Sequence, residues 1–354
     1  MRAEASQRAR KSSLGPFFVA CGCAIAWTFV LTAHAQSTAP REWKLSTALG
    51  PAYPQGRAGE VWTRLIGERS GGRLAVKHFP GATLAQRDLA REFAALRDGT
   101  IDLAVGSASN WAAQVKELNL VALPWLFPDR PALERVLASD VGQRLSSAVE
   151  DAGVVPLAIA AGAFQQIATR RGVHAPSDLA GLRLRSPPSL LFIETLLALD
   201  ALPVGLSSSD ARSMLSRGAL DGEVLGVAAF GAARLYASGA GHLLVWDGFA
   251  DALFFAVNRE DWAALSAADR ELVRQAARDA ALEASALARE QGGDAALARI
   301  AREGTTVTRL TRAGKEAFRV KTQAVYDRWS TMVGEDLVRA AEAVAGGGQT
   351  PQAR

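Results

Sequence analysis

The strongest candidate for binding chemistry is Arg185, which stands at the end of a short predicted strand. Residues 182–185 read Leu-Arg-Leu-Arg. Because side chains alternate across a strand, both leucines point to one face and both arginines to the other. Pro187 and Pro188 end the strand, since proline donates no ladder hydrogen bond, and a predicted helix over 190–199 follows. Ligands of open α/β sheets bind at the carboxyl ends of strands, and a guanidinium placed there matches the planar geometry of a carboxylate.

The residues alone leave a second interpretation of Arg185 open. Most charged side chains in folded proteins are exposed to solvent. The Leu-Arg-Leu-Arg pattern by itself therefore favours an arginine on a solvated strand face, paired with Asp178 seven residues earlier. Only the surrounding motifs can reverse this preference.

Catalytic motifs are absent from the sequence. It contains no G-x-S-x-G elbow, no P-loop and no G-x-G-x-x-G turn, and Gly239-Ala240-Gly241 is interpreted as a loop. Beyond the N-terminal segment, His78, His174 and His242 stand far apart, in no metal-ligand spacing and beside no plausible nucleophile. We therefore expect a binding protein rather than an enzyme, with no cofactor and no metal.

The N-terminus is predicted to be an export signal, residues 1–35. A basic stretch over 2–11 precedes the apolar run 17–31, and Ala33-His34-Ala35 fits the small-x-small rule for cleavage after Ala35. A retained membrane anchor is the first alternative, although the run is short for a span of about 20 residues. A lipoprotein cleaved before Cys21 is the second. Each of the three alternatives implies export from the cytoplasm.

Removal of this segment changes the composition of the chain. The remaining 319 residues contain no cysteine, since Cys21 and Cys23 leave with the signal, and their 36 basic and 35 acidic residues give a net charge of +1. A charge so close to zero argues against a nucleic-acid partner. The length is typical of two domains.

Beyond the signal, strands and helices alternate, which predicts parallel sheets with helical crossovers. The predicted strands are 43–49, 74–79, 101–106, 154–161, 182–185, 221–225 and 305–310. The predicted helices are 57–69, 86–98, 190–199, 207–218, a long alanine-rich one from 266 to 292, and further helices up to about 345. Residues 346–354 are predicted to be a disordered tail.

Six short motifs occur in a specific order between Trp43 and Gly334. They are GRLAV at 72–76, FPGATL at 79–84, ALRDGTID at 95–102, LPWLF at 123–127, DLAGLRLR at 178–185 and RGALDG at 217–222. In this order and spacing the chain resembles the dicarboxylate-binding family of solute-binding subunits from tripartite ATP-independent periplasmic (TRAP) transporters.

The resemblance implies an α/β fold of two lobes, each a mainly parallel sheet flanked by helices. The ligand cleft would lie between the lobes, and a long helix would span both. Lobe I would comprise 41–158 and 247–285, and lobe II 159–246 and 286–345. It also implies a periplasmic, monomeric protein that captures an organic acid and delivers it to the small and large membrane subunits of a TRAP permease.

Carried over by position, Arg185 matches the carboxylate-binding arginine of the family, which reverses the preference stated above. Other positions depart from the better-studied members. Gln165 stands where some members have a second arginine, and Ser107 and Asn110 replace charged contacts of the branch that binds sialic acid. One strong cationic contact therefore remains.

Three more positions complete the predicted ligand site. Leu225 stands where relatives have an asparagine after the Asp-Gly turn, Ser208 replaces an aromatic residue, and Trp111 is a candidate for lining the cleft. A polar ligand group that faced Leu225 would be left unpaired, which is costly when buried. We therefore expect a sparsely hydroxylated, monocarboxylic ligand rather than a sugar acid.

Two alternatives use the same scaffold. The protein could present its ligand to a membrane-bound sensor instead of a permease, and the soluble chain would look identical. It could also be an enzyme built on a binding-protein fold, which turnover of candidate acids would reveal.

Overall fold

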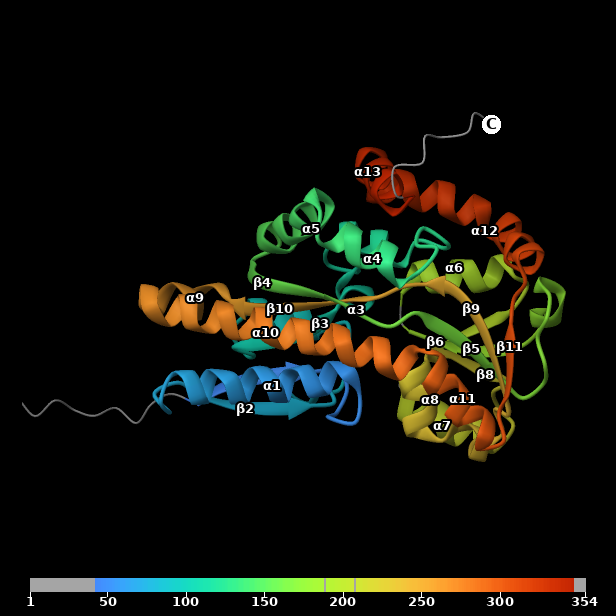
Figure 1. Ribbon diagram of the computed structural model, residues 1–354, viewed down its shortest axis with the longest axis horizontal. Helices are drawn as coiled ribbons and strands as arrows, with labels where there is room; N and C mark the ends of the chain where they lie inside the picture. Colours follow the sequence, from blue (N-terminus) through green and yellow to red (C-terminus); the bar gives the residue numbers. More distant parts are fainter. Residues whose placement is uncertain (1–41, 188, 207, 347–354) are drawn as a thin grey trace, which may run out of the picture. The chain divides into compact units, whose positions relative to one another are not determined.

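The computed structural model describes residues 42–187, 189–206 and 208–346 (Figure 1). The predicted signal over 1–35 and residues 347–354 of the predicted tail lie outside the described residues. No helix in the described ranges is both long and apolar enough to cross a bilayer.

The first sheet contains five strands in the order β2-β1-β3-β10-β4. The strands are β1 (Glu42–Thr47), β2 (Ala75–Pro80), β3 (Leu103–Ser107), β4 (Val154–Ala161) and β10 (Ala252–Asn258). β1 runs parallel to β2 and β3, whereas β10 lies antiparallel between β3 and β4. One strand from late in the chain thus completes a sheet that otherwise forms from its first half.

The second sheet contains six strands in the order β11-β9-β5-β8-β6-β7. They are β5 (Gln165–Thr169), β6 (Arg183–Ser186), β7 (Leu202–Gly205), β8 (Gly222–Gly226), β9 (His242–Phe249) and β11 (Thr306–Arg309). Here β5 is the antiparallel strand, between β8 and β9, and the other pairs are parallel. The prediction of two mainly parallel sheets is confirmed, with one reversed strand in each.

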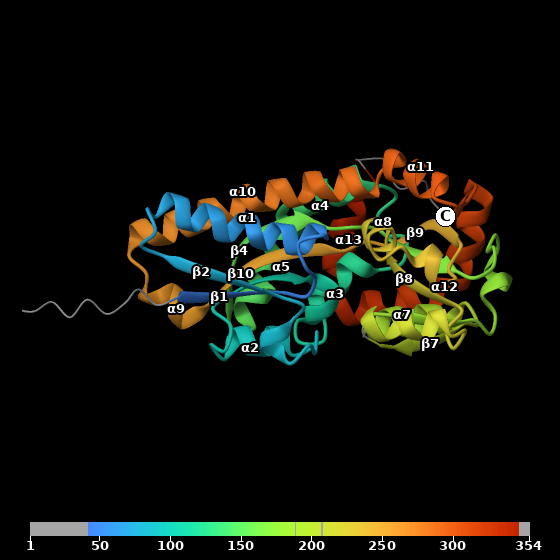
Figure 2. The ribbon, with the colours of Figure 1, turned by 90° about the horizontal axis from the view of Figure 1, so that it is seen from below.

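The chain passes between the sheets from β4 to β5, from β9 to β10 and from β10 to β11. Figure 2 shows β9 and β10, the two strands that the second of these passages joins. The sequence analysis did not identify β5, β7, β9 or β10. β9 and β10 are apolar throughout much of their length and were therefore difficult to separate from helix. The lobe boundaries predicted from the resemblance stay a prediction.

Helices cover both sheets. They are α1 (Pro54–Arg69), α2 (Glu92–Arg97), α3 (Ala108–Trp111), α4 (Arg130–Leu137), α5 (Asp140–Asp151), α6 (Leu190–Ala198), α7 (Ser208–Ser216), α8 (Val227–Ala233), α9 (Arg259–Ala264), α10 (Ala267–Gly292), α11 (Asp294–Arg302), α12 (Arg312–Val333) and α13 (Glu335–Ala345). Short 3₁₀ turns occupy 83–85, 116–122, 176–179 and 235–238.

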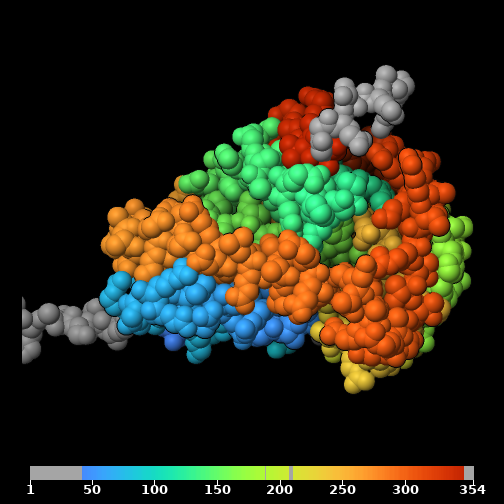
Figure 3. All heavy atoms as spheres, in the orientation of Figure 1, coloured from blue at the N-terminus to red at the C-terminus, as the bar shows by residue number. Residues whose placement is uncertain are grey.

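The long helix α10 begins where the sequence predicted. The Ser266 hydroxyl oxygen caps it by accepting a hydrogen bond from the Asp269 N–H. Its buried alanines pack against α1 and β4 of the first sheet, and it also contacts α8, which follows a strand of the second sheet. α10 therefore spans both sheets, and Figure 3 shows it at the surface beside α1.

Three buried apolar clusters hold these layers together. One lies between the first sheet and the pair α1 and α10, with Trp62 and Phe255 in edge-to-face contact at 5.4 Å between ring centroids. A second fills the outer side of the second sheet around Phe230. The third continues from one sheet to the other through Trp246 and Phe254, beneath α4, α6, α12 and α13.

One predicted helix is shorter than expected. The sequence indicated a helix over 86–98, but α2 covers Glu92–Arg97 alone. Gln86 and Arg87 have φ angles of 59° and 63°, in the left-handed region that an α-helix cannot accommodate. Residues before α2 form turns instead, and this places Leu89 in the wall of the pocket described next.

Candidate functional site

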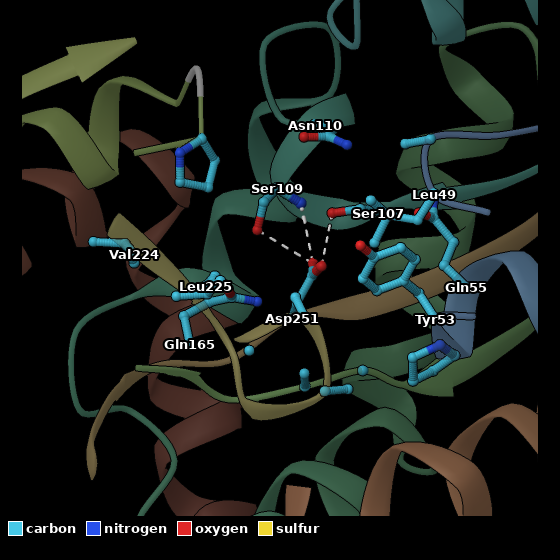
Figure 4. Close-up of a pocket in the computed structure, with 18 of the residues that line it drawn as sticks. Leu49, Tyr53, Gln55, Ser107, Ser109, Asn110, Gln165, Val224, Leu225 and Asp251 are labelled. Carbon is cyan, nitrogen blue, oxygen red and sulfur yellow. Dashed lines mark hydrogen bonds between the residues drawn. The ribbon is translucent and has the colours of Figure 1, made fainter. Parts of the chain in front are cut away.

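A pocket of about 160 Å³ lies where the two sheets meet (Figure 4). Figure 4 shows Gln165, Val224 and Leu225 on one side, Leu49, Tyr53 and Gln55 on the other, and Asp251 between them. The wall is mostly apolar. Its residues are Ala48, Leu49, Tyr53, Pro54, Gln55, Leu89, Ser107, Ser109, Asn110, Gly162, Ala163, Gln165, Arg185, Pro187, Phe192, Val224, Leu225, Gly226, Ala228, Ala229, Asp251 and Leu253.

Arg185 lies in this wall, on β6, with 5% of its surface exposed. Its Nη1 donates to a carboxylate oxygen of Glu223 at 3.0 Å, and its Nε donates to the Leu206 carbonyl at 2.9 Å. β6 and β8 are parallel with Arg185 opposite Glu223, so the register of the sheet brings this ion pair together. The other N–H donors of the guanidinium make no hydrogen bond to the residues that the structure describes.

Burial lowers the pKa of Arg185, and the adjacent Glu223 carboxylate opposes that effect. The side chain remains a cation, because arginine starts from a value far above neutral pH. Asp178 is not its partner, since the Asp178 carboxylate accepts hydrogen bonds from the backbone N–H groups of His174 and Ala175. A solvated arginine on an exposed strand face is therefore not what the structure contains.

Asp251 is the second charged residue in the wall. It lies between β9 and β10, where the chain passes from one sheet to the other. Its Oδ2 accepts from the Ser107 hydroxyl at 2.7 Å, and its Oδ1 accepts from the Ser109 hydroxyl at 3.2 Å and from two backbone N–H groups. Burial raises the pKa of Asp251, while these donors act in the opposite direction.

Four other predicted site residues share the pocket. Ser107, Asn110, Gln165 and Leu225 all line its wall, from β3, α3, β5 and β8 respectively. The Ser107 hydroxyl donates a hydrogen bond to the Asp251 carboxylate. Leu225 presents an apolar side chain that is almost completely buried.

The structure places Trp111 in the core rather than in the pocket wall. Its ring is fully buried, with Phe93 in edge-to-face contact at 5.2 Å, and its indole N–H donates to Glu92 at 3.3 Å. Glu92 also accepts from the Ser46 hydroxyl at 2.7 Å, and burial raises its pKa to about 7. Ser208 is the first residue of α7, and its side chain lies outside what the structure describes.

Sequence reasoning missed Asp251, Ser109, Tyr53 and Gln55 as parts of the wall. Asp251 could have been noticed in the sequence, because it is an acidic residue within the mainly apolar run 243–257. Burying a charged side chain is costly unless it has hydrogen-bond or ion-pair partners. The others gave no such signal, because their places depend on how the loops after β1 and β3 fold. Among the described residues, no cluster of His, Cys, Asp and Glu has the arrangement of a metal site.

Comparison with known proteins identifies the family and the fold. Residues 45–331 match the family model for DctP, the bacterial extracellular solute-binding proteins of family 7. The chain belongs to this family. Among curated relatives, the C4-dicarboxylate-binding periplasmic protein DctP of Shewanella loihica is 26% identical over 86% of this chain and 90% of its own. A solute-binding protein of Chromohalobacter salexigens is 25% identical over 84% of this chain and 87% of its own.

Solved structures agree with the family. A TRAP periplasmic solute-binding protein of Ralstonia eutropha, with bound (S)-2-acetolactate, is 42% identical over 86% of this chain and 99% of its own, with a TM-score of 0.85. One from Sulfurospirillum deleyianum, with bound succinate, is 25% identical over 86% and 98%, with a TM-score of 0.78. One from Chromohalobacter salexigens, with bound D-glucuronate, is 23% identical and shows the same fold.

This family-7 chain is therefore a two-lobed solute-binding protein of the TRAP type. The family and its structural relatives are binding proteins rather than enzymes. The sensor alternative receives no support from them. The predictions on the family, fold and general function are confirmed.

Proposed function

We propose that this protein binds a small monocarboxylate with one or two further oxygen atoms, and that Arg185 holds the carboxylate. The observation that carries the proposal is the composition of the pocket wall. Among the described residues of that wall, Arg185 is the cation, and most of the remaining surface is aliphatic. A second carboxylate on the ligand would find no second cation there.

Size and neighbours support the same class of ligand. A cavity of about 160 Å³ is smaller than the pockets of about 300–1,000 Å³ that take drug-sized ligands. Phe192, Leu225 and Leu253 offer methyl groups and a ring to a branched carbon skeleton, whereas a hydroxyl facing Leu225 would have no partner. The Ralstonia relative, 42% identical, has bound (S)-2-acetolactate, a branched hydroxy-oxo monocarboxylate. We propose that Gln165, Asn110, Ser107 and the start of α7 at Ser208 contact the ligand's other oxygens.

The test is calorimetric titration of the purified protein with (S)-2-acetolactate, succinate and D-glucuronate. We expect acetolactate to bind at least a hundredfold more tightly than glucuronate. Replacement of Arg185 with alanine should weaken acetolactate binding by roughly two to four orders of magnitude, because one partner of a buried charged pair is lost. Tight binding of glucuronate with none of acetolactate would refute the proposal, as would an unchanged affinity in the alanine variant.

We further propose that the protein is a monomer that engages the small and large membrane subunits of its transporter. Mass spectrometry of the exported protein should find Gln36 as the first residue, and a chain that begins at Cys21 would refute cleavage after Ala35. Light scattering should give the mass of one chain. Co-purification with both membrane subunits, dependent on the bound acid, tests the partner.

We propose the lobe boundaries from the resemblance as well, with 41–158 and 247–285 in lobe I and 159–246 and 286–345 in lobe II. The membership of the two sheets supports this division except at two strand ends: β4 of the first sheet extends to Ala161, and β9 of the second sheet extends to Phe249. Scattering curves with and without acetolactate should differ as a rigid rotation of these two bodies predicts.

A further inference from the structure

Asp251 places a carboxylate in the wall of a pocket built to bind an anion, which requires an explanation. Within the described ranges no lysine, arginine or histidine forms an ion pair with it. Four neutral donors hold it instead: the hydroxyls of Ser107 and Ser109 and the backbone N–H groups of Ser109 and Ala252. Arg185 of the same wall already has Glu223 as a partner. With Asp251 ionised, the form that its four donors favour, Arg185, Glu223 and Asp251 sum to one negative charge before a ligand enters.

The two oxygens of Asp251 are not equally occupied. Oδ1 accepts three hydrogen bonds, two of them from backbone N–H groups whose positions the fold fixes. Oδ2 accepts one, from Ser107. Since each carboxylate oxygen has about two lone-pair sites, Oδ2 keeps an acceptor site for a ligand group. Figure 4 shows this carboxylate between the two sides of the pocket.

We propose that Asp251 determines specificity: its Oδ2 accepts a hydrogen bond from a ligand hydroxyl, and its charge excludes a second carboxylate. The pocket then selects a hydroxylated monocarboxylate over both the deoxy acid and a dicarboxylate. This assignment rests on the proposed function, because it presumes that Arg185 holds the ligand's first carboxylate.

The Asp251 carboxylate would favour a hydroxyl on the ligand and disfavour a second carboxylate for two separate physical reasons. A hydroxyl is a donor and gains a charge-assisted hydrogen bond to Oδ2, which an analogue with hydrogen in its place cannot make. A second carboxylate on the ligand has no hydrogen to donate to Oδ2, and its negative charge would lie beside that of Asp251. Water is largely excluded from a closed pocket, so the repulsion between the two charges would be poorly screened. If Asp251 only held Ser107 and Ser109 in place at the start of α3, its replacement would change the affinity for ligands of equal size by the same factor.

Replacement of Asp251 with asparagine separates the two roles. The backbone N–H groups at Oδ1 require an acceptor there, so the amide oxygen takes that position and the amide nitrogen takes the place of Oδ2. The fold-supporting contacts to Ser109 and Ala252 are kept. The pocket then presents a neutral donor where the native protein presents a charged acceptor.

The experiment measures dissociation constants of the native protein and of Asp251→Asn for (S)-2-acetolactate, its deoxy analogue 2-methyl-3-oxobutanoate, and succinate. Asp178→Asn is the matched control, because that carboxylate also accepts two backbone N–H bonds but lies outside the pocket wall. In the native protein and the control we expect acetolactate to bind about ten- to a hundredfold more tightly than the deoxy acid. In Asp251→Asn we expect this preference to disappear and the affinity for succinate to rise at least tenfold.

The possible outcomes separate the role of Asp251 from the proposed function. If native protein binds acetolactate and Asp251→Asn keeps the preference for the hydroxyl and against succinate, the role of Asp251 is refuted while the proposed function stands. An equal loss of affinity for all three acids in Asp251→Asn would likewise refute it in favour of a structural role. If native protein binds none of the monocarboxylates, the proposed function fails, and this assignment fails with it.

Discussion

Glu92 gives the most quantitative prediction about this fold. The side chain is fully buried beside Trp111, where its two oxygens meet the Ser46 hydroxyl and the indole N–H, and its pKa is raised from 4.5 to about 7. We consider the replacement Glu92→Gln, which reproduces the protonated acid. The amide nitrogen can donate to the Ser46 oxygen while the amide oxygen accepts from Trp111.

The sign follows from linkage between proton binding and folding. Below pH 4.5 the glutamic acid is protonated in both the folded and the unfolded chain. Between pH 4.5 and about 7 the unfolded chain ionises while the folded chain stays protonated, so the free energy of unfolding falls as pH rises. Above about pH 7 both are ionised and the loss is complete. At about 1.4 kcal/mol per tenfold change, this loss amounts to about 3 kcal/mol.

Urea denaturation at pH 4.5 and pH 8 measures the effect. The difference in unfolding free energy between Glu92→Gln and the native protein should grow by about 3 kcal/mol from the lower to the higher pH, in favour of the variant. Other titrating groups cancel in this difference, because both proteins contain them. A difference that stays constant across the range, or one that favours the native protein at pH 8, would refute the reasoning. The effect is large against a typical stability of 5–15 kcal/mol.

Four further variants test the site and its support. Gly106→Ala should lower the unfolding free energy by about 1–3 kcal/mol in the same urea assay, since the added Cβ would lie 1.9 Å from the buried ring of Trp111; unchanged stability would contradict this packing. Arg185→Ala should cost about 3–5 kcal/mol because it leaves Glu223 buried without its cation, whereas Arg185→Met with Glu223→Leu should regain most of the stability and none of the acid binding. Leu225→Asn should lower the ratio of acetolactate to glucuronate affinity at least tenfold by titration calorimetry, and an unaltered ratio would speak against Leu225 as a barrier to hydroxyl-rich ligands.

Regular elements with a clear period were predictable from the sequence. The strand 154–161 was predicted with the residues that β4 has, and the start of α10 followed from its serine cap. Failures came where tertiary contacts override local pattern. Gln86 and Arg87 belong to an amphipathic pattern but adopt left-handed backbone angles, and the apolar strands β9 and β10 have no alternation to reveal them.

The candidate site divides in the same way. Strand periodicity and the following prolines placed Arg185 at the carboxyl end of its strand, but the pattern alone favoured a solvated side chain, and only the family resemblance pointed to the ligand site. Its partner was not predictable, since Glu223 lies opposite it only through the register between β6 and β8. Asp251 depends on a bend between strands of different sheets. Trp111 follows a strand as a wall residue would, yet the absence of a side chain at Gly106 lets its ring lie against the backbone in the core.

The position of β10 has a consequence for how the chain becomes a folded molecule. β10 occupies an interior place in the first sheet, between β3 and β4, although about ninety residues separate it from β4 along the chain. α13, near the carboxyl end, then packs on α4 and α5. A polypeptide that is synthesised from its amino end therefore cannot finish folding its leading half until its trailing half has been made. Pairings over such separations form slowly, so the leading half stays open to proteases and chaperones until nearly all of the chain is present.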